Sequence, residues 1–149
     1  MNYQYILDRL PYRSSFRFVD EISFLDPDKV VGHYTLKPDA FFYEDHFPGN
    51  PVTPGAILTE IMAQIGLVVM GIFLVTSDPA APAAPFFPLL TSADVSFLRM
   101  VLPGQKVTVI SRKIYFRFDK LKCGVTMQDE AGETIAKGVF AGMIKKLTK

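Results

Sequence analysis

Residues 44–64 read EDHFPGNPVTPGAILTEIMAQ, a proline-rich loop that runs into the start of a helix. Each of the three prolines fixes φ near about −65° and removes a backbone donor, so the loop is expected to be stiff. Thr53 is a favourable N-cap and Pro54 a favourable first residue for this helix. The first turn would then hold Gly55 and Ala56, at positions where amide groups have no partner inside the helix. We expect the Gly55 amide to stay open to a ligand at the positive end of the helix dipole.

The chain continues as a nearly unbroken apolar run to residue 75, interrupted by Thr59, Glu60 and Gln64. Glu60 and Gln64 are four residues apart and therefore share one face of the helix. A transmembrane helix is one interpretation, but such a helix needs about 20 mainly apolar residues and avoids charge. Here the uninterrupted part covers only the 11 residues 65–75, and Glu60 lies within the segment. The prediction is a buried core helix and no membrane span.

Glu60 has the apolar neighbours Ile57, Leu58, Ile61 and Met62. An alternative is that its carboxylate faces solvent, but with these neighbours at least one side of it must be apolar. We therefore predict that Glu60 is deeply buried. Burial disfavours the charged form of a carboxyl group, so the side chain is expected to hold a proton near neutral pH, as a general acid requires.

The composition limits the remaining possibilities. A length of 149 residues and an apolar content of 49% fit one folded domain, predicted to span 1–149. The net charge of +1 does not indicate a nucleic acid partner. Two histidines and one cysteine without zinc-site spacing argue against a metal, and no glycine-rich phosphate loop indicates a nucleotide cofactor. The single cysteine and the lack of a signal peptide before the first element predict a cytoplasmic protein.

The rest of the chain predicts a short N-terminal helix and an antiparallel sheet. Helical spacing covers 3–10, and an extended segment at 16–22 leads to a strand at 29–36. Further β-rich runs, joined by turn sequences, cover 89–98, 105–116, 122–129 and 133–145. An α+β fold follows, with five to six strands and the long helix laid on the sheet. Because this helix is apolar all round, we expect a subunit contact to cover its other side and to form a homodimer.

Several short motifs are distributed along the chain. They are 10–13 (LPYR) with 18–20 (FVD), 46–49 (HFPG) with 51–55 (PVTPG), 60–64 (EIMAQ), and 97–99 (FLR) with 101–104 (VLPG). Together they resemble the motifs of the FabZ-type 3-hydroxyacyl-[acyl-carrier-protein] dehydratases. The central match is specific, because His46 and Glu60 stand 14 residues apart with the prolines and glycines between them in place. The chain departs from the family pattern at Tyr12, where histidine is usual, and at Gln105, where aspartate is usual.

The resemblance implies a hot dog fold, in which a curled antiparallel sheet wraps one long helix. It implies dehydration of a (3R)-3-hydroxyacyl-[acyl-carrier-protein] to the trans-2-enoyl form, in fatty acid synthesis or a related polyketide or polyene pathway. It also implies a homodimer, with a hexamer as the common higher assembly, whose active sites combine His46 of one subunit with Glu60 of the other. Acyl carrier protein is the implied partner, its phosphopantetheine carries the substrate, and no other cofactor is expected. Arg99 and Arg112 are candidates for docking this acidic carrier.

The candidate residues suit this chemistry. A neutral imidazole at His46 is suited to remove the weakly acidic C2 proton, and a protonated Glu60 to help expel the 3-hydroxyl group. At the start of the helix the Gly55 amide, with Ala56 beside it, is expected to bind the thioester oxygen as negative charge develops there. Gln64, one turn beyond Glu60, is expected to orient the carboxyl group.

Two other interpretations use the same residues. In a hot dog thioesterase, Glu60 would activate water and His46 would orient the thioester. In a catalytically silent acyl-binding subunit, neither residue would react. A 3-hydroxyacyl thioester separates the three hypotheses, because they predict an enoyl product, a free thiol, and binding without turnover, respectively.

Overall fold

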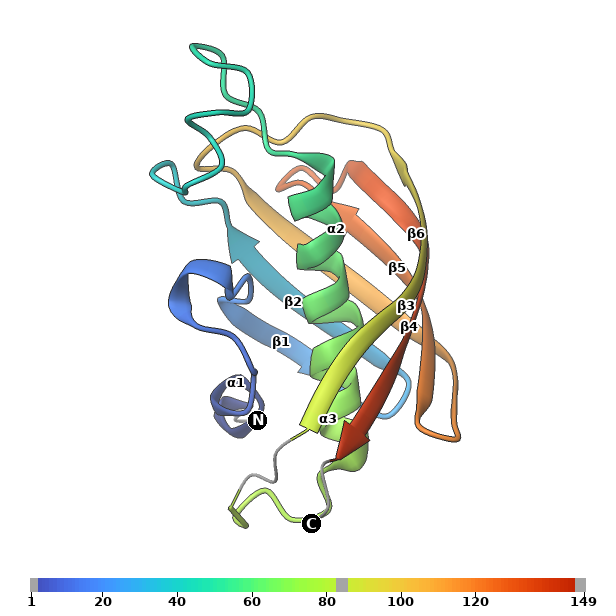
Figure 1. The fold of residues 1–149 in the computed structure, drawn as a ribbon. Helices are drawn as coiled ribbons and strands as arrows, with labels where there is room; N and C mark the ends of the chain where they lie inside the picture. Colours follow the sequence, from blue (N-terminus) through green and yellow to red (C-terminus); the bar gives the residue numbers. More distant parts are fainter. Residues whose placement is uncertain (1–2, 83–85, 147–149) are drawn as a thin grey trace.

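A computed structural model of the protein describes residues 3–82 and 86–146. Within these residues a six-stranded antiparallel sheet curls around one long helix (Figure 1). The strand order in the sheet is β1-β2-β4-β5-β6-β3. The strands are β1 (Glu21–Leu25), β2 (Lys29–Thr35), β3 (Phe86–Phe97), β4 (Lys106–Arg117), β5 (Lys120–Gln128) and β6 (Thr134–Lys146). The predicted α+β arrangement is therefore confirmed.

The central helix runs from Gly55 to Val75 and comprises α2 (Gly55–Ala63), a π-helical segment η2 (Gln64–Val69) and α3 (Met70–Val75). Its length and composition are those of a membrane span, but 72% of its most apolar window is buried inside the protein. The prediction of a core helix is confirmed. Every residue from 61 to 72 is buried within the single chain. The sheet and the N-terminal segment therefore cover the middle of the helix within one chain, while its two ends stay partly exposed, and the expected subunit contact stays a prediction.

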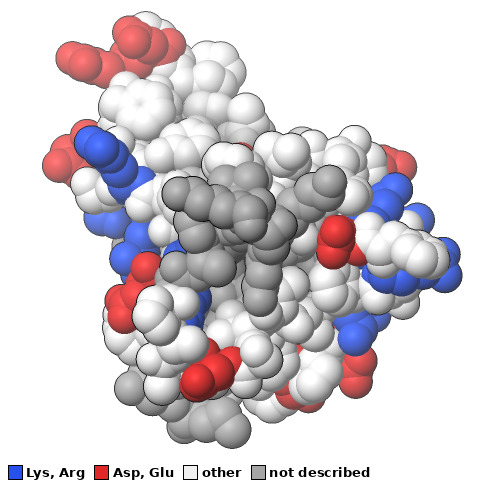
Figure 2. All heavy atoms as spheres, turned by 60° about the horizontal axis from the view of Figure 1, so that its bottom comes forward, with Lys and Arg blue, Asp and Glu red and all other residues white. Residues whose placement is uncertain are grey.

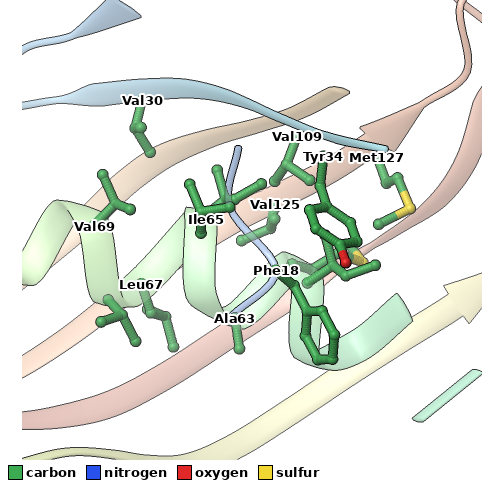
Figure 3. Packing of buried hydrophobic residues seen from close by; sticks show 14 of the residues in the cluster. Phe18, Val30, Tyr34, Ala63, Ile65, Leu67, Val69, Val109, Val125 and Met127 are labelled. Atoms are coloured by element: carbon green, nitrogen blue, oxygen red, sulfur yellow. The ribbon is translucent and has the colours of Figure 1, made fainter. Parts of the chain in front are cut away.

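Gly66 allows the helix to lie close against the sheet. A Cβ atom at this position would come within 2.9 Å of Val125 Cγ2, which leaves no room for a side chain. The Gly66 carbonyl, within the π-helical segment, accepts a hydrogen bond of 2.9 Å from Ser111 Oγ. Ser111 alternates with Val107 and Val109 along β4, and all three are fully buried, so this face of the strand is covered. Figure 3 shows Val109 and Val125 in this core.

The N-terminal segment holds a short helix, α1 (Gln4–Asp8), and a 3-10 turn, η1 (Ser14–Phe16). The prediction of an extended segment over 16–22 is only partly correct, because Phe16 ends the turn and β1 starts at Glu21. Between them, the backbone of Phe18 bonds to the side chain of Gln64 on the helix and not to a neighbouring strand. A side chain 46 residues away therefore decides the local conformation here.

Helix α2 starts one residue later than predicted and lacks the predicted cap. Pro54 occupies the N-cap position, and its carbonyl accepts hydrogen bonds from Ile57 N at 2.9 Å and Leu58 N at 3.1 Å. The Thr53 hydroxyl pairs instead with the Tyr43 hydroxyl at 2.5 Å, and both residues are buried. This contact ties the loop to the start of the helix, so the loop is held by tertiary packing and not by a side-chain cap.

Candidate active site

Gln64 lies at the centre of the candidate site. It is fully buried, and its side chain makes three hydrogen bonds. Its Oε1 accepts from Phe18 N at 2.8 Å, while Nε2 donates to Phe16 O and to Glu60 Oε2, both at 2.9 Å. Because the Phe18 N–H needs an acceptor, the amide has one satisfactory orientation, with its NH2 group toward Glu60. This geometry is the one that the predicted role of Gln64, orientation of Glu60, requires.

Glu60 opens into an apolar cavity of about 250 Å³, which is walled by the helix, by β3 and β6, and by the segment after α1. Of the described residues that line it, Glu60 and Tyr12 have polar side chains. The others are Phe16, Ala63, Leu67, Val68, Pro88, Leu89, Leu90, Gly142 and Ile144. Glu60 is half-buried, so the prediction of deep burial is wrong for the single chain, because its carboxyl faces this cavity.

The surroundings of the cavity change the acidity of both polar groups. Burial raises the pKa of the Glu60 carboxyl above its usual range, and the hydrogen bond from Gln64 opposes this in part. Burial also raises the pKa of the Tyr12 phenol, and the nearby Glu60 charge raises it further. Desolvation is the larger effect in each case, and it penalises the charged form. Both groups are thereby biased toward protonated, hydrogen-bond-donating forms.

His46 lies in the loop between β2 and α2, and its ring is partly exposed. Its Nδ1 is 2.7 Å from Val52 O. A carbonyl oxygen only accepts, so Nδ1 carries the proton, and in the neutral ring Nε2 keeps its lone pair free. The ring lies beside Phe47, whose φ of 66° is unusual for a residue other than glycine. The loop thus presents an imidazole with a defined tautomer, as a general base requires.

The start of α2 is open to solvent. Gly55 and Ala56 are exposed, and their amide groups precede the first hydrogen bond of the helix, which Ile57 N donates. Gly55 has no side chain to meet the Phe97 ring, whose Cζ lies 3.4 Å from the place that a Cβ would take. The two amides therefore face outward at the positive end of the helix dipole, where an anionic oxygen is favoured.

The single chain brings only part of the predicted site together. Glu60 and Gln64 are in contact, but His46 is not among the described residues that line the Glu60 cavity. The structure adds Tyr12, which the sequence shows only as a departure from a family pattern. In the sequence, the position of Tyr12 directly after Leu10 and Pro11 is the only feature that points to it. Whether this segment folds back onto the helix depends on tertiary contacts, which the sequence does not display.

A family model described as a FabA-like domain matches residues 10–138 of the chain. The chain belongs to the FabA-like family. All of the predicted site residues of this FabA-like protein lie in the matched region. Two similar relatives are the 3-hydroxyacyl-[acyl-carrier-protein] dehydratases FabZ of Rickettsia africae and Caldicellulosiruptor saccharolyticus. The first is 31% identical over 144 residues, covering 96% of this chain and 95% of the relative. The second is 31% identical over 141 residues, covering 94% and 96%. A bifunctional LpxC/FabZ enzyme of Porphyromonas gingivalis is 35% identical over 115 residues, which cover 76% of this chain but only 24% of that enzyme.

Solved structures support the fold of this FabA-like chain. The dehydratase heterocomplex ApeI:P from Xenorhabdus doucetiae matches with a TM-score of 0.76 and 15% identity, covering 96% of this chain and 91% of that chain. A hypothetical thioesterase with coenzyme A from Streptococcus pneumoniae TIGR4 matches with a TM-score of 0.63 and 14% identity, covering 87% and 88%. At these identities the likeness concerns the fold alone, and it confirms the predicted hot dog arrangement.

Proposed function

We propose that this protein dehydrates (3R)-3-hydroxyacyl thioesters on acyl carrier protein to trans-2-enoyl thioesters. The observation that carries the proposal is a carboxyl group of raised pKa, Glu60, held by Gln64 in an apolar cavity. The cavity suits an acyl chain, and a protonated carboxyl supplies the acid that a poor leaving group needs. The FabZ relatives, which the chain covers almost completely, are named for this dehydration.

In the proposed reaction His46 Nε2 takes the C2 proton, and the C2–H electrons form the C2–C3 double bond. The C3–O bond breaks, and the hydroxyl group takes the Glu60 proton and leaves as water. The Gly55 amide, with Ala56 beside it, donates to the thioester oxygen while negative charge builds there. Removing one donor of this kind costs about 10²–10³ in rate. The phosphopantetheine arm of the carrier supplies the thioester, and the proposal needs no other cofactor.

His46 and Glu60 are proposed to come from different subunits of a homodimer. Strand β3 supports this, because it is 12 residues long and stands at the edge of the sheet, where backbone groups lack a neighbouring strand. Its apolar side chains are also open to solvent, with exposed fractions of 61% for Leu89, 48% for Leu90 and 47% for Phe97. Leu89 and Leu90 line the Glu60 cavity. A second copy along β3 would cover them, narrow the cavity and supply its own His46.

The carrier protein is proposed to dock on the tip of the β4–β5 hairpin, residues 112–122, which we call the basic hairpin. Its basic side chains are Arg112, Lys113, Arg117, Lys120 and Lys122, against the single acid Asp119. Figure 2 shows basic side chains gathered at the right of the face it presents, where Figure 1 places this hairpin. Lys120 pairs with Met143 and Met143 with Leu89, so the hairpin lies two strands, about 10 Å, from the cavity wall. Arg99, the other predicted docking residue, pairs with Glu133 at 3.5 Å outside the hairpin.

The function is tested with a 3-hydroxyacyl pantetheine and with the same acyl group on the carrier. Enoyl formation by the wild type supports the proposal, whereas release of free thiol would indicate a thioesterase, and binding without turnover a silent subunit. His46→Ala and Glu60→Gln are each expected to abolish enoyl formation and to leave the protein folded, with a cooperative thermal transition. Mixing the two variants should restore about a quarter of the activity, because half of the random dimers then contain one intact site. No recovery on mixing would place both residues in one subunit.

Docking is tested by charge reversal. Arg117→Glu together with Lys120→Glu is expected to raise KM several-fold for the carrier-bound substrate but not for the pantetheine thioester, since the charges steer the carrier alone. Lys137→Glu, at an exposed position on β6, is the matched control and should change neither value. An equal effect on both substrates would show that the hairpin acts on the site and not on the carrier.

A further inference from the structure

Tyr12 shares the cavity of Glu60. It lies directly beyond Pro11 in the segment after α1, and its ring packs against the core, 6.3 Å from the Phe16 ring between centroids. Of the eleven described residues that line the cavity, nine are apolar, and Tyr12 and Glu60 carry the polar side-chain atoms. A cavity of this kind holds an apolar chain and leaves two polar groups to fix one end of it.

Tyr12 and Glu60 are not hydrogen-bonded to each other. The Tyr12 hydroxyl makes no hydrogen bond to any residue in 3–82 or 86–146, and the bond that Glu60 receives from Gln64 occupies Oε2 only. The two groups are nevertheless near enough for the Glu60 charge to raise the pKa of the Tyr12 phenol. Both residues are only partly buried, and no buried side-chain polar atom of the described residues lacks a partner, so a polar ligand atom between the two groups would take the place of water and be bonded by both.

We propose that Tyr12 is a second hydrogen-bond donor to the substrate, opposite Glu60, and that the two groups together bind the 3-hydroxyl oxygen. The inference rests on the dehydratase function proposed above and adds the group that recognises the leaving oxygen. A hydroxyl oxygen has two lone pairs, so it accepts from the Tyr12 phenol and from protonated Glu60 at the same time. Burial raises the pKa of Tyr12 further above neutral, so the phenol remains a donor at every working pH.

The two groups have different roles in the elimination. The base takes the C2 proton, the C3–O bond breaks with its electron pair on oxygen, Glu60 transfers its proton to that oxygen, and water leaves. Glu60 is left as a carboxylate. Tyr12 transfers no proton, but its hydrogen bond strengthens as negative charge builds on the departing oxygen. Tyr12 therefore selects acyl chains with a hydroxyl group at C3 and also assists its departure.

Binding tests the recognition step. Tyr12→Phe removes one oxygen atom that has no hydrogen-bond partner among the described residues, so the fold should be retained. Affinities are measured in the Glu60→Gln background, which prevents turnover, with 3-hydroxyhexanoyl pantetheine and hexanoyl pantetheine. The ratio of the two Kd values isolates the hydroxyl group. Tyr12→Phe is expected to lower the preference for the hydroxylated compound about three- to tenfold and to leave the Kd of hexanoyl pantetheine unchanged. A side chain with a packing role alone would move both Kd values together.

Kinetics tests the assistance to the leaving group. With Glu60 intact, Tyr12→Phe should lower kcat for dehydration about tenfold or more, because hydrogen bonds to groups that become charged are the stronger ones. Tyr12→His should retain both the rate and the hydroxyl preference, since an imidazole N–H also donates. Tyr5→Phe is the matched control: Tyr5 is partly buried against the core, is not among the described lining residues of the cavity, and should leave both readouts unchanged.

The outcomes separate this inference from the function on which it rests. If the wild type forms no enoyl product, both fail. If the wild type is active and Tyr12→Phe keeps its kcat and Kd ratio, the inference alone is wrong. If Tyr12→Phe does not fold, the decision passes to Tyr12→His: a folded Tyr12→His without hydroxyl preference overturns the inference, and one that keeps the preference supports it.

Discussion

Replacing Gln64 with leucine tests whether one buried amide both stabilises the fold and sets the acidity of Glu60. Leucine has a similar size but no donor or acceptor. The substitution leaves the Phe18 N–H and the Phe16 carbonyl without the partners that Gln64 provides at 2.8 and 2.9 Å. The Phe18 N–H is buried, and a buried group left unpaired costs about 1–3 kcal/mol, whereas Phe16 is an exposed residue whose carbonyl can bond to water, so the free energy of unfolding should fall by about 1–3 kcal/mol. That is a large part of the total for a domain of this size.

The same change should shift the pH dependence of the reaction. The bond from Gln64 lowers the pKa of Glu60, while desolvation raises it. Removing the bond therefore raises this pKa further. In the proposed reaction Glu60 acts as an acid, so the rate should fall as pH rises through its pKa, and this fall should move to higher pH in Gln64→Leu.

Urea denaturation measures the first effect, and the pH profile of kcat the second. Gln105→Leu is the control, because Gln105 is only partly buried and its side-chain oxygen accepts one bond, from Leu102 N at 3.1 Å. It should lose less than about 1 kcal/mol. A loss below about 1 kcal/mol in Gln64→Leu, or a fall in rate that moves to lower pH, would refute the reasoning.

Three further substitutions test the stability of the site, the core and the assembly. Burial raises the pKa of Glu60 in the folded protein above its usual value of 4.5. The stability that the protonated Glu60 side chain contributes is therefore fully present below pH 4.5 and is lost as the pH rises through the raised pKa. The glutamine in Glu60→Gln does not titrate, so this variant should become more stable relative to wild type as the pH rises from 4.5 to 8, as measured by urea denaturation. A decrease in its relative stability over this range would contradict the raised pKa. Ser111→Ala removes the hydrogen bond that Ser111 Oγ donates to the Gly66 carbonyl and should lower the free energy of unfolding by about 0.5–1.5 kcal/mol, whereas Ser23→Ala, at an exposed position, should have little effect. Leu89→Asp places a charge on the exposed edge strand β3 and should shift sedimentation toward monomer with a parallel loss of activity, while an active dimer of this variant would exclude β3 as the interface.

The parts of the fold that could be predicted from the sequence are those that depend on residues close together in the chain. The apolar run after Pro54 predicts a core helix, and the helix observed from Gly55 to Val75 is mostly buried. The alternation of Val107, Val109 and Ser111 predicts a strand with one covered face, and all three are buried. The spacing of Glu60 and Gln64 predicts a shared helix face, and their side chains are hydrogen-bonded. Each of these predictions depends on neighbours within a few residues, which the sequence displays directly.

The predictions from sequence are wrong or incomplete where contacts between residues far apart in the chain set the local structure. Thr53 has the chemistry of a cap, but its hydroxyl is taken by Tyr43 from the preceding loop. The extended segment at 16–22 is interrupted because Gln64 binds the backbone on either side of Arg17. Tyr12 joins Glu60 in one cavity only because the chain returns to the helix after α1.

The sequence by itself thus determined the main elements, the order in which they follow one another, and the candidates for an acid, a base and a free helix end. Only the tertiary structure decided which backbone groups hold Gln64, what lines the cavity, and which apolar strand is left exposed for a partner. The physical reason is that periodicity and capping act over a few residues, whereas hydrogen bonds and cavity walls join residues separated by tens of positions, which no local pattern encodes.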